Sequence, residues 1–311
     1  MVSRRSFLRS TVAAGAGAVA SVQTSLRAAA QPAHRMIVDA QVHLWKAESP
    51  DWKWVPGLTP QLPEPMTIER ILPLMDEAGV DRVVIVPPSW VGDRNDYGLE
   101  AVRRYPDRFR VMGRFPVQDP QAAARLPTWK DQPGMLGIRL TFNNEATRPW
   151  LSDGTIDWFW PAAEKAQLPL YLFTPGQTAK LGPIAERHPQ LTLIIDHMGL
   201  SQAMAKNNTI AAAIDQTVAL AKYPNVSVKV SASPGVSNEP YPFRDVTVHL
   251  QRVFDAYGPQ RCYWGSDLTN TFAKGPYRQR VAHFTEELKF LSESDRDWVL
   301  GRAILARLNW S

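Results

Sequence analysis

The chain has 311 residues, of which 44% are hydrophobic and 21% charged, a balance typical of a globular protein with a sizeable core. Its net charge is +5, but four arginines and no acidic residue fall within the first 30 residues, so the rest of the chain carries only +1. That small charge argues against a nucleic-acid-binding surface. The single cysteine, Cys262, excludes an intramolecular disulfide.

The first 30 residues have the layout of an export signal. Ser3–Arg9 contains an arginine pair followed by Phe-Leu, an Ala- and Gly-rich stretch comes next, and Ala28–Ala30 offers small residues for cleavage. The stretch is too short and too rich in small residues to anchor stably in a membrane. We therefore expect a twin-arginine signal peptide over residues 1–30, a mature domain over 31–311, and a periplasmic or secreted location. The alternative is a disordered basic tail.

Downstream of this segment, short apolar runs rich in β-branched residues recur along the chain. Runs of this kind are typical of strands buried on both faces of a parallel sheet. The expected strands are Met36–Val42, Arg82–Val86, Phe109–Arg114, Met135–Leu140, Pro169–Phe173, Leu191–Ile195, Val226–Val230 and Cys262–Trp264.

Amphipathic segments between these runs predict helices. The first has Thr67 as its N-cap and Gly79 as its stop, and Pro73 should kink it or delay its start. The last should close the fold against the barrel's outside. The expected helices are Thr67–Ala78, Tyr97–Tyr105, Gln121–Trp129, Thr155–Ala166, Thr178–His188, Ile210–Tyr223, Phe243–Tyr257, Tyr277–Leu291 and Asp295–Leu308.

This alternation over about 280 residues predicts an α/β fold, a single-domain (β/α)8 TIM barrel. An open doubly wound sheet is the alternative. It usually brings a glycine-rich turn after its first strand, where this chain has Gln41–Trp45.

Residues capable of acid–base chemistry follow three of the expected strands: His43, His197 and Asp267. The carboxyl ends of barrel strands meet at one end, where enzymes of this architecture place their chemistry. A carboxylate near imidazoles can deprotonate a water molecule, so we expect Asp267 to act as a general base. The alternative for Asp267 is a helix cap or turn residue. The other histidines are expected to be surface or packing residues; they are His34, His188, His249 and His283.

Two cations, Arg139 and Lys229, also end strands. A buried cation needs an anionic partner, either a substrate carboxylate or an internal salt bridge. Arg114 is a weaker candidate of the same type. Asp196, one residue before His197, is expected to orient its neighbours. The Pro- and Trp-rich stretch that begins at Trp45 should form a lid or pocket wall and bring Trp45 to the substrate.

Five short motifs occur in order along the chain: Ile37–Trp45, Gly137–Leu140, Ala185–Gly199, Val226–Ser231 and Trp264–Asp267. In this order they resemble the amidohydrolase superfamily, in the branch with the amidohydrolase-2 domain. That branch includes dicarboxylate and sugar-acid lactonases and some decarboxylases. The resemblance implies a (β/α)8 hydrolase.

Within that pattern, the resemblance makes His43 the second histidine of a strand-one pair, His197 the strand-six histidine, and Asp267 the aspartate that activates water. The sequence departs from the pattern at Gln41, where the first histidine of the pair is usual, and at the end of strand five, where no histidine occurs. His43, His197 and Asp267 remain as a three-ligand set for one zinc or manganese ion. The alternative is a site that works without metal.

These features predict a hydrolase that opens a lactone or cyclic ester of a small carboxylic acid. Asp267 would take a proton from water, and the two imidazoles would polarise the carbonyl. Arg139 and Lys229 would hold a substrate carboxylate. The alternatives are a non-oxidative decarboxylase of the same family and a non-catalytic periplasmic small-molecule-binding protein with a degenerate site.

Overall fold

Eight parallel strands form the centre of the described chain, residues 34–311, in this computed structural model. The expected signal segment lies outside the described residues. The strands are β1 (Val38–Val42), β2 (Arg82–Ile85), β3 (Phe109–Gly113), β4 (Met135–Thr141), β5 (Leu170–Phe173), β6 (Leu193–Ile195), β7 (Val226–Ser231) and β8 (Cys262–Gly265). Each expected strand matches an observed one to within two residues at either end.

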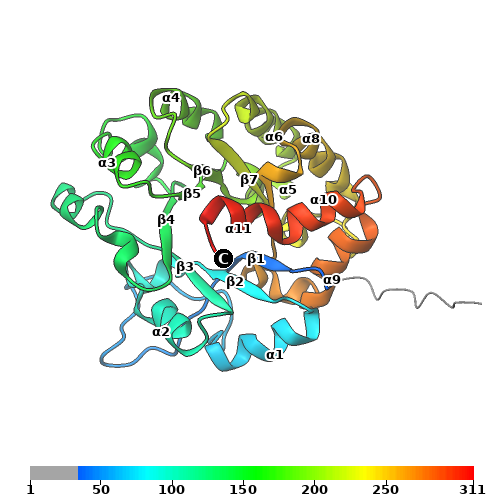
Figure 1. Ribbon diagram of the computed structural model, residues 1–311, viewed down its shortest axis with the longest axis horizontal. Helices are drawn as coiled ribbons and strands as arrows, with labels where there is room; N and C mark the ends of the chain where they lie inside the picture. The colour runs from blue at the N-terminus through cyan, green and yellow to red at the C-terminus, as the bar shows by residue number, and fades with distance from the viewer. Residues whose placement is uncertain (1–33) are drawn as a thin grey trace, which may run out of the picture. The chain divides into compact units, whose positions relative to one another are not determined.

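Consecutive strands are neighbours in the sheet from β1 to β8. Beyond β8, the Asp267 backbone N–H donates to the Gln41 carbonyl at 3.2 Å, which brings the end of β8 back to β1. The strands therefore form a nearly closed barrel with helices outside it (Figure 1). The predicted (β/α)8 fold is confirmed.

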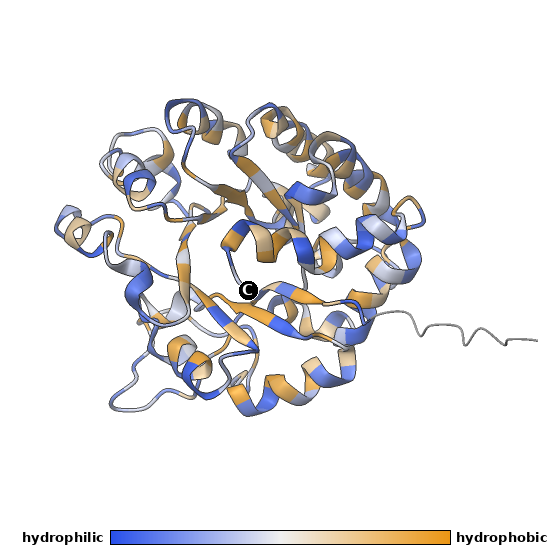
Figure 2. Cartoon of the chain, in the orientation of Figure 1, coloured by the Kyte–Doolittle hydropathy of each residue, from blue (hydrophilic) through white to orange (hydrophobic). Residues whose placement is uncertain are grey.

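Helices follow most of the strands and turn their apolar faces toward them (Figure 2). They are α1 (Ile68–Ala78), α2 (Asp96–Arg104), α3 (Phe159–Lys165), α4 (Leu181–Arg187), α5 (Gln202–Lys206), α6 (Ile210–Ala219), α7 (Ser233–Val236), α8 (Thr247–Tyr257), α9 (Tyr277–Ala282), α10 (Glu293–Asp297) and α11 (Ala303–Leu308). In α1 the Thr67 hydroxyl accepts the Arg70 N–H at 3.3 Å and Gly79 ends the helix with φ 70°. Pro73 lies inside α1 and does not delay its start.

The expected helix Gln121–Trp129 is wrong. Two short 3-10 turns, Pro120–Arg125 and Trp129–Asp131, take its place. Pro127 explains the difference, because proline lacks the N–H that would continue an α-helix and its ring clashes with the preceding turn.

The C-terminal helix covers one end of the barrel (Figure 1). The sequence predicts that it packs against the outside of the barrel, and this prediction is wrong. Ile304 and Leu308 belong to one buried apolar cluster with inward-facing strand residues such as Val38 and Ile194. The Trp310 ring lies 5.2 Å from the guanidinium carbon of Arg82, the first residue of β2. The covered end is therefore the amino end of the strands, which leaves the carboxyl end for a binding site.

A register shift in β1 redirects its side chains just before the carboxyl end. Asp39 pairs with Val83 and Val42 with Ile85, so β1 has one extra residue here. Bulges of this kind re-aim side chains next to functional sites. Asp39 itself ties the two barrel edges together, because its Oδ1 accepts the backbone N–H groups of Gln41 and Ser266, both at 2.9 Å.

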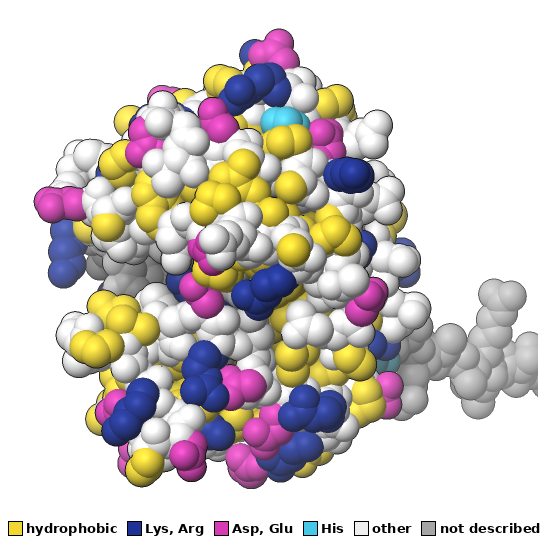
Figure 3. Space-filling view, turned by 90° about the vertical axis from the view of Figure 1, so that its left-hand side faces the viewer, with side chains coloured by type: hydrophobic (Ala, Val, Ile, Leu, Met, Phe, Trp, Pro, Cys, Tyr) yellow, Lys and Arg dark blue, Asp and Glu magenta, His cyan; other side chains and the backbone are white. Residues whose placement is uncertain are grey.

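The surface of the described chain carries mixed charge. On the face shown in Figure 3, basic and acidic side chains are interspersed among hydrophobic ones. Among the described residues, no helix is both long enough and apolar enough to cross a membrane.

Candidate active site

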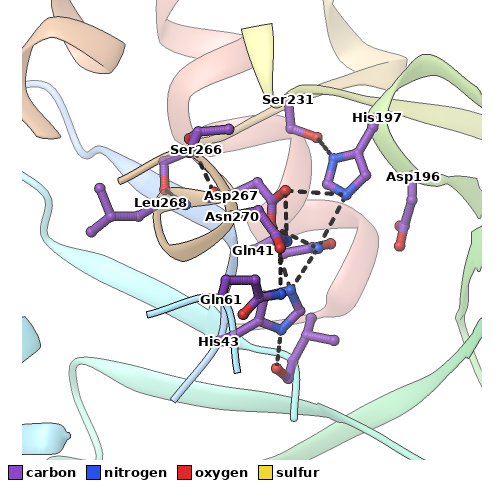
Figure 4. A network of polar contacts seen from close by, with 12 residues as sticks. Gln41, His43, Gln61, Asp196, His197, Ser231, Ser266, Asp267, Leu268 and Asn270 are labelled. Atoms are coloured by element: carbon purple, nitrogen blue, oxygen red, sulfur yellow. Dashed lines mark hydrogen bonds and ion pairs between the residues drawn. The ribbon is translucent and has the colours of Figure 1, made fainter. Parts of the chain in front are cut away.

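The structure brings His43, His197 and Asp267 together at the carboxyl end of the barrel (Figure 4). His43 Nε2 lies 3.4 Å from Asp267 Oδ1, and His197 Nε2 lies 3.8 Å from Asp267 Oδ2. The three side chains are almost fully buried. They come from the ends of β1, β6 and β8, as the barrel architecture predicts.

The backbone is strained just after β6, β7 and β8. His197, Ala232 and Asp267 have φ values of 52°, 63° and 47°, in the left-handed region that non-glycine residues avoid. Such residues persist only where surrounding contacts hold them, and they cluster at functional sites. In His197 and Asp267 the turn presents a side chain to the barrel axis.

The two imidazoles present proton acceptors to the site. His43 Nδ1 lies 2.7 Å from the Val86 carbonyl, which can only accept, so Nδ1 carries the proton and Nε2 is free in the neutral ring. His197 Nδ1 lies 2.8 Å from Ser231 Oγ. Burial lowers the pKa of His197 to about 4, so this ring is neutral at pH 7. A neutral imidazole with a free ring nitrogen can accept a proton from a water molecule.

Asp267 is ionised at neutral pH. Burial alone would raise its pKa, but in the acid range where a carboxyl group titrates His197 becomes positively charged. That charge, together with the interactions of His43, outweighs burial and holds the pKa of Asp267 well below its ordinary value. Asn270 adds to this effect, since its Nδ2 donates to both carboxylate oxygens at 2.8 and 3.0 Å. Gln61, from the long loop after β1, donates to Asn270 Oδ1.

Gln41 lies at the centre of this group, although the sequence suggested only that a ligand was missing there. Its Nε2 is 3.2 Å from His197 Nε2, 3.3 Å from Asp267 Oδ1 and 3.5 Å from His43 Nε2. Its Oε1 accepts a hydrogen bond from Lys229 Nζ. The side chain therefore connects the acid–base group to the buried lysine beneath it.

Asp196 holds two cations in the barrel interior. Its Oδ1 is 2.7 Å from Lys229 Nζ and its Oδ2 is 3.1 Å from Arg139 Nε. Burial lowers the pKa of Lys229 to about 8, and the Asp196 charge opposes that shift. Conversely, Lys229 and Arg139 hold the pKa of Asp196 below its ordinary value against the effect of burial.

The residues at this centre do not fit a divalent metal ion. The described residues contain no cluster of three or more His, Cys, Asp and Glu arranged to hold one. The imidazole lone pairs of His197 and His43 face the Gln41 amide nitrogen, which is a donor and cannot ligate a cation. The adjoining Lys229 ammonium adds a positive charge.

A cavity of about 340 Å³ opens onto this centre, and His43 forms part of its wall. Leu58 and Gln61, from the long loop after β1, contribute to the lining, as does Trp90. Trp45, the predicted substrate contact, is fully buried and packs edge-on against Trp90 with ring centroids 5.1 Å apart.

Of the two predicted cationic contacts, Arg139 lines the cavity, whereas Lys229 is fully buried beneath Gln41. Phe173, at the end of β5 where the sequence has no histidine, packs edge-on to His197 at 5.5 Å between ring centroids. The Arg139 guanidinium carbon lies 5.4 Å from the same Phe173 ring.

Arg114 is better placed than its sequence suggested. It lines this cavity and an adjoining one of about 280 Å³, both of which Arg139 also lines. Its Nε and Nη1 atoms are buried without a hydrogen-bond partner in the described chain. Burial lowers its pKa to about 10, reinforced by the charge of Arg139 and opposed by Asp93. A buried guanidinium with unused donors is suited to an anionic group on a ligand.

A sequence profile of the amidohydrolase family matches residues 38–305, nearly all of the described chain. The chain belongs to the amidohydrolase family. It is 27% identical to an L-fucono-1,5-lactonase of Burkholderia ambifaria over 74% of this chain and 79% of that protein. It is 26% identical to a 4-sulfomuconolactone hydrolase of Rhizobium radiobacter over 70% of this chain and 71% of that protein.

Solved structures share the fold. An amidohydrolase from Burkholderia multivorans with bound zinc has a TM-score of 0.72 at 20% identity, over 88% of this chain and 99% of that one. A 5-carboxyvanillate decarboxylase from Sphingomonas paucimobilis has a TM-score of 0.63 at 16% identity, over 89% of this chain and all of that one. The solved structures show the fold alone, whereas the family profile and the lactone-cleaving relatives show that the chain is a hydrolase.

Proposed function

We propose that this amidohydrolase opens the ring of a small lactone that carries an anionic group. The observation that carries the proposal is the ionised Asp267 carboxylate, which lies 3.4 Å from His43 Nε2, while His43 itself lines the cavity. Two relatives that cleave lactones support the substrate class. An ester carbonyl is also reactive enough for hydrolysis without a strong Lewis acid, unlike an unactivated amide.

In the proposed reaction, a water molecule in the cavity contacts both Asp267 Oδ1 and His43 Nε2, which lie 3.4 Å apart. The water oxygen forms a bond to the lactone carbonyl carbon, and its proton passes to the Asp267–His43 pair. The tetrahedral intermediate then expels the ring oxygen, which takes that proton back. The product is an open-chain hydroxy acid, and the acid–base pair returns to its starting state.

Arg114 and Arg139 are the cationic groups of the cavity wall and would bind the anionic group of the substrate. Arg114 has unused buried donors, whereas Arg139 already engages Asp196 through Nε. We therefore expect Arg114→Gln to raise KM by about 10- to 100-fold, which corresponds to loss of a charge-assisted hydrogen bond of about 1.5–3 kcal/mol. The exposed Arg103, on α2, supplies the matched control, since Arg103→Gln should leave KM unchanged.

Asp267→Asn tests the proposed function. The variant keeps the shape of the side chain but removes the base, so turnover on a panel of anionic lactones should fall by about 10²–10⁴-fold. Binding of the same lactones, measured by calorimetry, should persist. Asp255→Asn, on the exposed face of α8, is the matched control. A wild-type protein that binds these lactones and never hydrolyses them would refute the proposal in favour of a binding protein.

The decarboxylase alternative has a separate readout. Carbon dioxide release from aromatic or dicarboxylic acids, without lactone turnover, would favour it over hydrolysis. Its support here is the shared fold with the Sphingomonas decarboxylase.

We also infer that residues 1–30 direct export through the twin-arginine pathway, which carries folded chains. The support is the sequence alone: Arg4 and Arg5 are followed by Phe-Leu and then by small residues. Replacing both arginines by lysine should keep the protein out of the periplasmic fraction. Unchanged fractionation would refute the inference.

A further inference from the structure

The Gln41 carboxamide has a fixed orientation. Lys229 Nζ can only donate hydrogen bonds, so the Gln41 atom that faces it is the oxygen Oε1. The amide nitrogen must then face His43, His197 and Asp267, all of which offer acceptors. A rotated amide would place two N–H groups against an ammonium and an oxygen against a carboxylate.

The Gln41 amide has two N–H groups, and three acceptor atoms lie around it. The shorter contacts of Gln41 Nε2 are those to His197 Nε2 and Asp267 Oδ1, at 3.2 and 3.3 Å. The contact to His43 Nε2 is longer, at 3.5 Å. Since His43 lines the cavity, its Nε2 lone pair remains available to a water molecule there.

We propose that the Gln41 amide, locked by Lys229, takes the place that a metal ion would hold among His43, His197 and Asp267. Its N–H groups hold His197 and Asp267 by hydrogen bonds instead of coordination. A zinc ion would need the imidazole lone pairs at about 2.0–2.1 Å, and one of these is committed to Gln41. Lys229 is a positioning residue in this arrangement, because it fixes the polarity of the amide without touching the substrate.

The charges beneath the site support this role for Lys229. Asp196 pairs with Lys229 Nζ at 2.7 Å and is shared with Arg139. The Lys229 ammonium also lies 3.7 Å from the centre of the buried Tyr171 ring. These contacts keep a positive charge under Gln41 Oε1, which opposes the binding of a divalent cation above it.

Zinc binding tests the proposal independently of turnover. Wild-type protein purified without chelators should contain less than about 0.1 zinc per chain, and dialysis against a chelator should leave its activity unchanged. Gln41→His removes the N–H donor and adds a third imidazole. Its zinc affinity, measured by calorimetry with zinc chloride alone, should rise at least about 100-fold over wild type. Gln251→His, on the exposed face of α8, controls for zinc binding by an added surface imidazole.

Lys229→Met provides a second test of the lock. Without the ammonium, the Gln41 amide can turn its oxygen toward the imidazoles, so zinc affinity should rise by about tenfold or more. Near-stoichiometric zinc in the wild-type protein would overturn the proposal even if neither variant folds. Equal zinc affinity in folded Gln41→His and wild type would also overturn it. Lactone turnover is read separately, so a metal-bound wild type that hydrolyses lactones would refute this inference and leave the proposed function standing.

Discussion

The buried ion triad of Asp196, Lys229 and Arg139 gives the sharpest quantitative prediction. Asp196→Asn keeps the shape of the side chain but removes the negative charge shared by the two cations. Asp196 and Lys229 are fully buried, and Arg139 is 7% exposed. Breaking a buried pair by removing one partner costs about 3–5 kcal/mol, because a charge is left uncompensated.

The two cations should not contribute equally to that cost. The pKa of Lys229 is about 8 in the folded protein and falls further without Asp196, so releasing its proton at pH 7 costs about 1 kcal/mol or less. Arg139 cannot release its proton and stays charged. The loss in free energy of unfolding caused by Asp196→Asn should therefore be about 3–5 kcal/mol rather than twice that range, and Arg139 should account for the larger part.

The pH dependence follows from the same pKa. Burial lowers the pKa of Lys229 from 10.5 to about 8 in the wild type, and removing Asp196, which opposes that shift, lowers it further. Between pH 7 and 8 the folded variant binds fewer protons than the folded wild type, so its stability rises with pH while that of the wild type does not. The difference in free energy of unfolding should shrink by about 1 kcal/mol over this interval and change little above it.

Urea unfolding followed by tryptophan fluorescence, at pH 7, 8 and 9, measures both quantities. The exposed ion pair of Asp215 and Arg252 supplies the control, and Asp215→Asn should cost less than about 1 kcal/mol at every pH. A cost for Asp196→Asn below about 1 kcal/mol, or one that does not change between pH 7 and 8, would refute the account of the triad given above.

Three further predictions test the site and its support. Asn270→Ala removes two hydrogen bonds to the Asp267 carboxylate and so raises its pKa. The acid side of the plot of kcat against pH should therefore move to higher pH, and an unchanged plot would contradict this. Burial lowers the pKa of His283 from 6.5 to about 4, so the free energy of unfolding falls as pH drops through that interval. His283→Leu should remove up to about 3 kcal/mol of that loss, measured by urea unfolding at pH 7 and pH 4. Equal acid sensitivity in both proteins would rule this out. Gly199→Ala should lower the free energy of unfolding by about 2–4 kcal/mol, because φ is 73° and a Cβ would lie 2.4 Å from a threonine oxygen. Gly57→Ala, with φ 80° and open space, is the control and should cost about 1 kcal/mol. Equal costs would show that the contact is irrelevant.

The barrel was predictable because each strand is a short apolar run bounded by polar residues, a local signal that needs no knowledge of the rest of the chain. The errors arose where local periodicity competes with another property. Gln121–Trp129 has helical spacing, but Pro127 breaks it. The sequence predicts the wrong packing surface for the last helix, because an apolar face does not specify which apolar surface it meets.

The candidate site was partly predictable for a similar reason. Residues just after parallel strands converge at one end of a barrel, so His43, His197 and Asp267 could be selected from their position alone. Pairwise contacts are not encoded in that rule. The sequence gives no sign that Trp45 lies behind Trp90, or that the donors of Arg114 have no partner in the folded chain.

Gln41 and Lys229 show most clearly what position alone cannot reveal. They lie 188 positions apart in the sequence, and each is ambiguous without the other. A glutamine among imidazoles and a carboxylate can present either its oxygen or its nitrogen, and only the second gives a hydrogen-bonded centre. A buried lysine without an acceptor above it would be an unfavourable charge beside two imidazoles. Together they specify one amide orientation, so the departure from the family pattern at Gln41 makes physical sense only with the ammonium of Lys229 beneath it.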